Sequence, residues 1–223
     1  VETPAIDRLA ADGVVFEHAY AHAPTTLPSH ASILTGLLPA DHGARDNGGF
    51  TMDPAVPTLA GMLSEAGYRT GGFVSAFPIR ADTGIARGFD VYDDDFAADP
   101  GAGLGEIQRS GGQTLARALA WLDEPSAEPP FLFLHLFEPH RPYEPPVPFA
   151  GRFAPYDGEI AESDRVVGAL LDGLRDRSLY EPALVVLLSD HGEGLGEHGE
   201  EGHGIFIYRW ALQVPMIAKL PAD

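Results

Sequence analysis

Two long apolar runs, residues 131–137 and residues 183–188, are the feature that most constrains the fold of this chain. Each follows a segment with helical spacing of apolar residues, at residues 113–122 and 159–175 respectively. A strand that is apolar along its whole length is typical of a parallel sheet covered by helices on both faces. We therefore predict an α/β fold: a three-layer αβα sandwich with a mostly parallel sheet.

The first third of the chain shows the same order of helix and strand. Thr3 and Pro4 have the form of a helix start, with threonine as N-cap and proline in the first turn, and Gly13 ends the helix. A second helix is predicted over residues 57–66, followed by a strand at residues 70–75. We expect one domain over residues 1–223. Two segments rich in glycine or proline are predicted to be surface loops: residues 93–112 and 139–155.

The charge balance excludes several kinds of partner. Asp and Glu total 33 against 14 Lys and Arg, a formal net charge of -19, which argues against nonspecific binding of nucleic acid or acidic lipid. An acidic chain that binds an anionic ligand needs cations to do so. The chain has no cysteine, so disulfides, thiolate metal sites and a cysteine nucleophile are excluded. It also has no apolar run of membrane-spanning length.

The second apolar run is followed directly by Asp190 and His191, an oxygen donor and a nitrogen donor. Gly192 would let the backbone turn sharply there, so that both side chains face one point. We predict that this pair binds a metal ion, the alternative being an acidic, solvated loop. His198 and His203, further along the same loop, could complete the site or could simply be exposed.

The first apolar run leads to His140, which has a proline one residue before it and another two residues after it. Prolines restrict the backbone and favour a fixed orientation of the imidazole. Two interpretations remain open for this segment. His140 is a second metal ligand or a hydrogen-bonding partner of the substrate, or the segment is a proline-rich surface turn.

Thr26 lies just ahead of a predicted helix that starts at Pro28 and ends at Gly36. The backbone N–H groups and the positive end of the helix dipole favour a phosphate or sulfate oxygen at that position. A threonine hydroxyl is a poor nucleophile unless a divalent cation lowers its pKa. Thr26 is therefore a candidate nucleophile, and the alternative is that Thr25 or Thr26 only caps the helix.

At this point the chain resembles the sulfatase and alkaline-phosphatase superfamily of metal-dependent hydrolases. The resemblance runs from residues 3–10 through residues 189–192 to residues 214–217. In sulfatases the nucleophile region reads Cys or Ser, any residue, Pro, Ser, Arg, and the first residue becomes formylglycine. Residues 26–30 of this chain follow the same pattern, with Thr26 in the first position and His30 in place of the arginine. Threonine is not a formylglycine precursor, so the usual sulfate-ester mechanism does not carry over.

The same frame is similar to nucleotide pyrophosphatase/phosphodiesterases, which use an unmodified threonine. Their Thr-Gly, His-Gly and Asn positions correspond to Thr35-Gly36, His42-Gly43 and Asn47. Taken alone, residues 46–49 are also a simple turn sequence. His203 lies where many sulfatases have a lysine. The resemblance implies these roles: Thr26, His140 and His203 as catalytic residues, Asn47 and His30 as substrate-binding residues, and Asp190, His191 and Thr26 as metal ligands.

The implied activity is hydrolysis of phosphate mono- or diesters through a threonine nucleophile. Alternatives are sulfate-ester hydrolysis, transfer of a phospho-group to an alcohol, and a noncatalytic domain that retains the fold. The substrate would be a small-molecule or polymer-linked anionic ester. One or two divalent ions are expected, with zinc or manganese favoured over calcium or magnesium because imidazole prefers the softer ions.

The resemblance also implies an alkaline-phosphatase-like fold that is truncated at both ends in this chain. In the family, a first strand carrying one or two metal-binding aspartates would precede residue 1, and a further subdomain would follow residue 223. We therefore expect residues 1–223 to hold only part of the metal site. The family resemblance points to a periplasmic, secreted or membrane-anchored location, and the residues themselves give no compartment.

Overall fold

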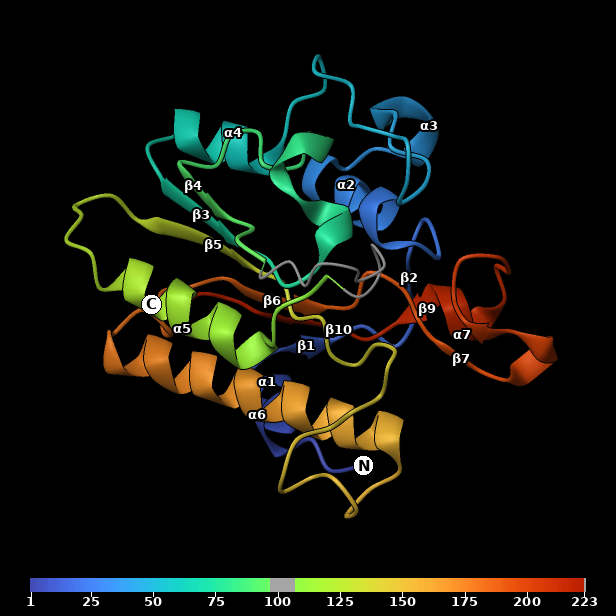
Figure 1. Ribbon diagram of the computed structural model, residues 1–223. Coiled ribbons are helices and arrows are strands. Elements are labelled where there is room, and N and C mark those ends of the chain that lie inside the picture. The colour runs from blue at the N-terminus through green and yellow to red at the C-terminus, as the bar shows by residue number, and fades with distance from the viewer. Residues whose placement is uncertain (97–106, 223) are drawn as a thin grey trace.

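The computed structural model, which describes residues 1–96 and 107–222, has a central layer of strands between two layers of helices (Figure 1). One helical layer contains α1 (Pro4–Ala11), α5 (Gly111–Leu122) and α6 (Pro155–Asp176). The other contains α2 (Thr26–Thr35), α3 (Pro39–His42) and α4 (Leu59–Glu65). The predicted three-layer α/β architecture is confirmed. Within the described residues, no helix is both long enough and apolar enough to cross a membrane.

The strands form one parallel and one antiparallel group of three. The parallel group has the order β4 (Val91–Asp93), β3 (Arg69–Phe73), β5 (Pro130–Leu134), with Gly71 opposite both Val91 and Leu132. The antiparallel group has the order β1 (Val14–Val15), β10 (Met216–Lys219), β6 (Val185–Leu188). β6 therefore departs from the parallel pairing expected for most of the sheet. The reason is that β10 returns beside it through short elements, without a helical crossover.

Several short elements connect these parts. The strand pairs β2 (Ala19–Tyr20) with β9 (Gln213–Val214), and β7 (Gly194–Leu195) with β8 (Glu201–Gly202), are both antiparallel. The helix α7 (Arg209–Leu212) precedes β9. Three single turns of 3-10 helix complete the elements of the described residues: Phe77–Ile79, Ala81–Thr83 and Glu197–Gly199.

The apolar run at residues 131–137 is explained by packing on both faces of β5. Leu132 and Leu134 pack against a cluster that includes Ala118 and Trp121 of α5. Phe133 points the other way and packs against the core that includes Leu27 of α2. Since successive side chains of a strand alternate between faces, a strand between two helical layers has to be apolar at every position.

The second apolar run is covered on one face only by the described residues. Val185 and Leu187 of β6 pack against the cluster around Leu9 and Ile217. The alternate side chain Val186 is 44% exposed and lies on the opposite face. β6 also has a hydrogen-bonded neighbour on one side only, β10, among the residues that the structure describes. Burial on both faces was expected for both apolar runs and, of the two, is seen for β5.

Two helices begin earlier than the sequence predicts. α2 starts at Thr26 with Thr25 as its N-cap residue, two residues before Pro28, and ends at Gly36 in the left-handed conformation. α6 starts at Pro155, because proline is accepted in a first helical turn, where its missing N–H is not needed. The predicted loop at residues 139–155 is therefore correct up to its last residue. Of the predicted loop at residues 93–112, residues 97–106 lie outside the described part.

The start of α1 is capped by a distant carboxylate. Thr3 occupies the N-cap position, but its hydroxyl donates to Asp7 and makes no cap hydrogen bond to the backbone. Asp164 of α6 is buried and accepts from the backbone N–H of Ala5, at 3.0 Å, and of Ile6, at 2.8 Å. A negative charge at a helix N-terminus is favourable. Thr3 is thus the boundary residue, as expected, while the capping itself comes from another helix.

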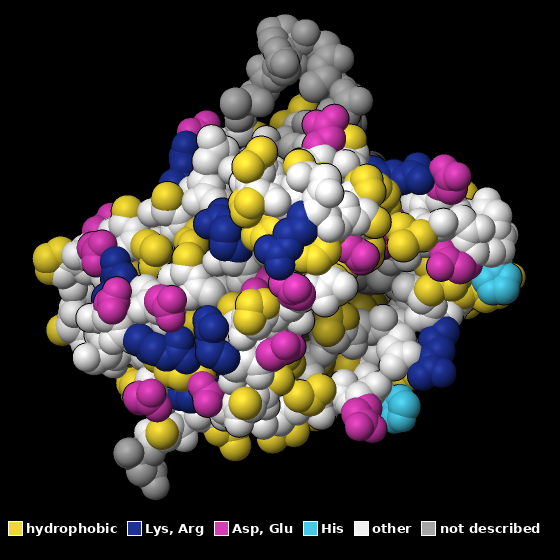
Figure 2. Space-filling model, turned by 90° about the horizontal axis from the view of Figure 1, so that it is seen from below, with side chains coloured by type: hydrophobic (Ala, Val, Ile, Leu, Met, Phe, Trp, Pro, Cys, Tyr) yellow, Lys and Arg dark blue, Asp and Glu magenta, His cyan; other side chains and the backbone are white. Residues whose placement is uncertain are grey.

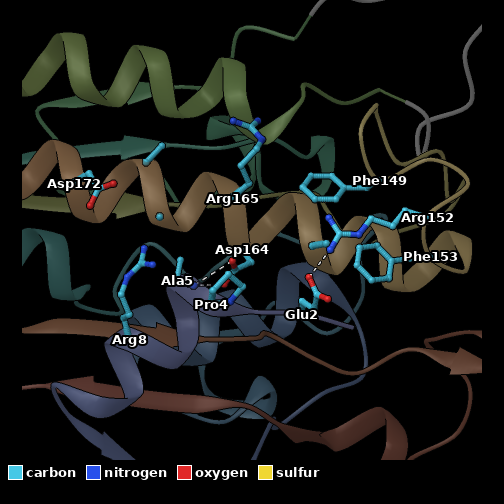
Figure 3. A pocket seen from close by; sticks show the side chains of 13 residues that line it. Glu2, Pro4, Ala5, Arg8, Phe149, Arg152, Phe153, Asp164, Arg165 and Asp172 are labelled. Atoms are coloured by element: carbon cyan, nitrogen blue, oxygen red, sulfur yellow. Dashed lines mark hydrogen bonds and ion pairs between the residues drawn. The ribbon is translucent and has the colours of Figure 1, made fainter.

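A cavity of about 460 Å³ lies beside this contact, between α1, α6 and residues 149–153 (Figure 3). Arg152 and Glu2 form an ion pair at its edge, 2.6 Å apart. The surrounding face carries basic and acidic side chains in alternation (Figure 2). Local pairing of this kind places arginines on an acidic protein without creating an extended basic surface.

Replacing Asp164 with alanine should destabilise the protein by about 1–3 kcal/mol, because the first N–H groups of α1 lose a buried acceptor. Urea unfolding monitored by circular dichroism would measure the free energy of unfolding. Asp172→Ala on the same helix is the matched control, since the Asp172 side chain is 68% exposed and, among the described residues, forms an ion pair with Arg175 alone. The control should change stability by less than about 0.5 kcal/mol. Equal effects of the two substitutions would contradict the capping role.

Candidate active site

Four segments that are far apart in the sequence meet at one end of the sheet. They are the start of α2, the segment that follows β5, the segment that follows β6, and the segment after β8. The segments after β5 and β6 leave the carboxyl ends of their strands. Ligand sites in α/β sheets gather at such ends, because loops from several strands converge there.

Thr26 faces His191 across this junction. Its Oγ1 is 3.4 Å from Nε2 of His191, and the residue is 8% exposed. The next backbone N–H, that of Leu27, donates to Oδ1 of Asn47 at 2.8 Å. Asn47 therefore lies beside Thr26, although it is twenty residues away. Its carbonyl oxygen stabilises the start of α2, and its amide group remains for other contacts.

Asp190 is held as a carboxylate by the imidazoles around it. Its Oδ2 is 3.3 Å from Nδ1 of His30 and 3.3 Å from Nε2 of His191. Burial by itself would raise the pKa of Asp190, but the charge of the neighbouring histidines, His191, His30 and His135, brings it below its ordinary value. Ser29 also donates its hydroxyl to the backbone carbonyl of Asp190. Asp190 is therefore fixed against α2 by two of its residues.

His191 is oriented by its own loop. Its Nδ1 donates to the carbonyl of Gly192 at 2.9 Å, and this contact turns its Nε2 toward Thr26 and Asp190. Gly192 does not have the positive φ expected of a sharp glycine turn. Instead, a Cβ at this position would lie 1.8 Å from the carbonyl oxygen of Trp210. The glycine is required by the close approach of two backbone segments.

His140 and His203 form a second group next to the first. Their Nε2 atoms are 3.2 Å apart, and the rings of His203 and His191 have centroids 4.0 Å apart. His203 Nδ1 donates to the carbonyl of Pro24, just before α2, at 2.9 Å. Burial lowers the pKa of His203 to about 4 and the pKa of His140 below its ordinary value. Both rings are therefore neutral near pH 7.

The remaining predicted residues occupy different surroundings. His30 is buried below the junction, where its Nδ1 faces the carbonyl of Thr26 at 2.8 Å as well as Asp190. Its substrate-binding role stays a prediction. His198 is exposed and stacks on Tyr208, with ring centroids 4.1 Å apart. Of the histidines predicted in this loop, His191 and His203 join the cluster through the contacts above.

Sequence reasoning missed two residues of the cluster, Glu193 and His135. Glu193 follows Asp190 and His191 in the same loop, and burial raises the pKa of its carboxyl to about 7. His135 lies just after β5, its ring 4.9 Å from that of His30, and burial lowers its pKa to about 3. The signal available for His135 was a lone titratable residue inside an otherwise apolar run. No signal distinguished Glu193 from the other acidic residues of its loop.

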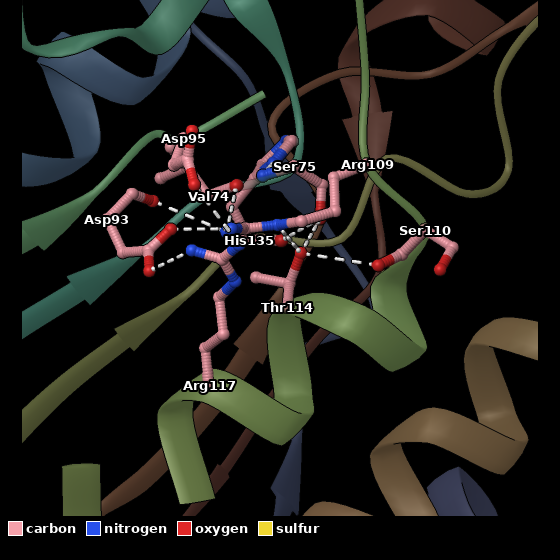
Figure 4. Close-up of polar contacts among 9 residues, drawn as sticks. All are labelled: Val74, Ser75, Asp93, Asp95, Arg109, Ser110, Thr114, Arg117 and His135. Atoms are coloured by element: carbon pink, nitrogen blue, oxygen red, sulfur yellow. Dashed lines mark hydrogen bonds and ion pairs between the residues drawn. The ribbon is translucent and has the colours of Figure 1, made fainter. Parts of the chain in front are cut away.

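A buried polar network holds His135 from behind (Figure 4). The backbone N–H of Ser75 donates to Nδ1 of His135 at 3.3 Å, and the Ser75 hydroxyl contacts Thr114 at 2.6 Å. Arg109 donates to Thr114 at 3.0 Å and to the carboxylate of Asp93. The network ties β3, β4 and the start of α5 to the strand end that carries His135.

The donor atoms suit a divalent cation. Asp190 offers an ionised carboxylate, His191 offers an Nε2 atom oriented by its backbone contact, and Thr26 offers a hydroxyl close to His191. Histidines that bind a metal ion usually donate their other ring nitrogen to a carbonyl or carboxylate, which fixes the orientation of the ring. Oxygen and imidazole donors without sulfur favour ions such as Zn²⁺ and Mn²⁺.

Comparisons with known proteins agree with this geometry. A family model described as Sulfatase matches residues 1–223. The chain is 48% identical over 75 residues to an N-acetylgalactosamine-6-O-sulfatase of Bacteroides thetaiotaomicron, covering 32% of this chain and 15% of that protein. It is 28% identical over 204 residues to a venom phosphodiesterase of Macrovipera lebetinus, covering 85% of this chain and 23% of that protein.

Solved structures show the same fold. The phosphonate monoester hydrolase of Agrobacterium radiobacter superposes with a TM-score of 0.81 at 21% identity, over 99% of this chain and 64% of that one. Fold and site together define an alkaline-phosphatase-like α/β protein from a superfamily of ester hydrolases. Within that superfamily, the chain belongs to the sulfatase family. It spans only a part of the length of each relative named above.

Changing Gly192 to alanine should destabilise the protein by about 1–3 kcal/mol or more, since the added methyl group overlaps a backbone oxygen. The displacement would also move Asp190 and His191 and weaken binding of divalent cations. Thermal unfolding and zinc titration would measure the two effects. Gly48→Ala is a control, because a Cβ there meets no atom within 4 Å, and it should leave the melting temperature unchanged. A stable Gly192→Ala protein would contradict the close packing.

Proposed function

We propose that the protein is a metal-dependent hydrolase of phosphate mono- or diesters and that Thr26 is its nucleophile. The observation that carries the proposal is the convergence of Thr26, Asp190 and His191. Thr26 lies on the first turn of α2. Asp190 and His191 lie just beyond the end of β6, more than 150 residues further along the chain. A threonine that only capped α2 would need neither of the other two side chains.

The proposed first step is displacement at phosphorus. Thr26 enters as an alkoxide after its proton has been released to solvent, its Oγ1 forms a bond to phosphorus, and the bond from phosphorus to the leaving oxygen breaks. A divalent ion held by Thr26, Asp190 and His191 would supply the lowered hydroxyl pKa that this step needs. The leaving alkoxide takes up a proton from solvent. Water then hydrolyses the phosphothreonine and restores the hydroxyl.

Neighbouring groups supply the rest of the site. The side-chain amide of Asn47 and the backbone N–H of Thr26 are the candidate donors to the non-bridging oxygens of the substrate, where charge accumulates. His140 and His203 lie beside His191 and are the candidates for assisting the leaving oxygen. Burial lowers the pKa of both rings, so they are poor proton donors at neutral pH and would position the leaving group, whose proton comes from solvent.

Thr26→Ala should lower the hydrolysis of an aryl phosphate by about a thousandfold or more, because the nucleophile is lost while Asp190 and His191 remain. Metal analysis of the purified full-length protein should show that the metal content is retained. Thr26→Ser keeps a hydroxyl and should retain part of the activity. Unchanged turnover in the alanine variant would exclude Thr26 as the nucleophile and would favour a noncatalytic domain that has kept the fold.

Sulfate-ester hydrolysis is the second candidate, because the family model and a 48% identical segment both point to sulfatases. Threonine at the nucleophile position favours hydrolysis of a phosphate ester over a sulfate ester, since sulfatases use formylglycine at that position. The full-length protein should be assayed with an aryl phosphate, an aryl phosphodiester and an aryl sulfate. We expect the highest kcat/KM for one of the phosphate esters. Faster hydrolysis of the sulfate would replace the first proposal with the second.

A further inference from the structure

The segment that carries His140, residues 138–146, has few backbone donors with which to hold its own shape. Prolines occupy positions 139, 142, 145 and 146, and a proline has no backbone N–H. In the structure, none of these nine positions belongs to a helix or a strand. The position of the segment therefore depends on contacts with other elements of the fold.

One carboxylate binds this segment at two points. Glu159, near the start of α6, accepts from the backbone N–H of His140 at 3.0 Å through Oε2 and from that of Glu144 at 2.8 Å through Oε1. The residue is buried, with 5% of its surface exposed. Hydrogen bonds from backbone N–H groups to a carboxylate are charge-assisted, and their loss inside a protein leaves a donor without a partner. Both oxygens of Glu159 are thus used to fix the backbone of residues 140–144.

The face of α6 around Glu159 is shaped to receive the same segment. A Cβ at Gly158 would lie 2.7 Å from Cγ of Pro145, so the glycine permits the close approach of the segment to the helix. One turn further along α6, the hydroxyl of Ser163 donates to the backbone carbonyl of Glu138 at 2.9 Å. The segment is therefore seated on α6 at both of its ends and, through Glu159, in its middle.

His140 projects from this segment into the candidate active site. Its Nε2 lies 3.2 Å from Nε2 of His203, and the ring of His203 lies 4.0 Å from that of His191. On the other side of the ring, Nδ1 donates to the backbone carbonyl of Arg141 at 2.6 Å. The ring is thus tied to its own backbone, and a displacement of that backbone moves the imidazole with it.

We propose that Glu159 is a positioning residue of the candidate active site, which holds the backbone of His140 and so keeps the imidazole beside His203. Because both of its oxygens accept from backbone N–H groups, Glu159 acts through His140 and not on a ligand directly. The effect on catalysis rests on the proposed function, in which His140 lies beside the leaving oxygen. The effect on the position of the ring does not depend on that function.

The first test uses no substrate. Glu159→Gln keeps the size of the side chain but turns an amide donor toward one of the two backbone N–H groups, so one contact is lost. In the full-length protein labelled on histidine, we expect the NMR signals of the His140 ring, assigned with His140→Ala, to shift or broaden. The signals of the exposed His198 should stay unchanged. Circular dichroism would verify that each variant is folded.

Glu162→Gln is the matched control. Glu162 lies three residues further along α6 and is 6% exposed, but its carboxylate binds the side chain of Arg165. This variant should leave the signals of His140 where they are in the wild type. Unchanged signals of His140 in a folded Glu159→Gln protein would overturn the proposal.

The second test is a double-mutant cycle on the hydrolysis of an aryl phosphate. Glu159→Gln should lower kcat/KM by about ten- to a hundredfold, since a small displacement of a group in the site is enough for such a loss. In a His140→Ala background the same substitution should cost less than about twofold, because the group that Glu159 positions is gone. Equal losses in the two backgrounds would show a purely structural role and would overturn the proposal.

The two tests separate this proposal from the proposed function. If the wild type hydrolyses none of the esters, the proposed hydrolase fails, and the NMR comparison still decides whether Glu159 positions His140. If the wild type is active, both tests have to give the expected result.

Discussion

The contact between Asp190 and α2 is the constraint on which the rest of the site depends. Asp190 lies just past the end of β6, and α2 packs in the opposite half of the molecule against β3 and β5. The hydroxyl of Ser29 and the ring of His30 both bind Asp190, so one carboxylate fixes the start of α2 relative to the sheet. Thr26 reaches His191 only because this contact sets the position of the helix.

Near this contact Asp190 stays ionised, while the buried rings of His135, His140 and His203 stay neutral. Asp190 keeps a low pKa among imidazoles, while burial lowers the pKa values of His135, His140 and His203. Such a combination offers one negative charge and several lone pairs to an incoming cation. For the proposed anionic ester, such a cation would offset the repulsion from a chain with a net charge of -19.

The support of the site comes from the layers around it. β5 is covered on both faces, so the end of the strand is a rigid support for His135. The hydrogen-bond network through Ser75, Thr114 and Arg109 fixes the orientation of that ring. The loop that carries His191 is anchored where Gly192 packs on the backbone of Trp210. Rigid supports of this kind keep donor atoms in place without the ligand.

The sequence by itself determined the α/β class and the order of helices and strands, and it singled out Thr26, Asp190 and His191 as candidates, because hydrophobic periodicity and donor pairs at strand ends are local signals. It placed the start of α2 two residues late and favoured a mostly parallel sheet, whereas β6 pairs antiparallel with β10. Only the tertiary structure decided that Glu193 and His135 join the cluster and that His198 stacks on Tyr208 instead. Those outcomes depend on how loops distant in sequence pack together, and no local pattern of residues encodes that packing.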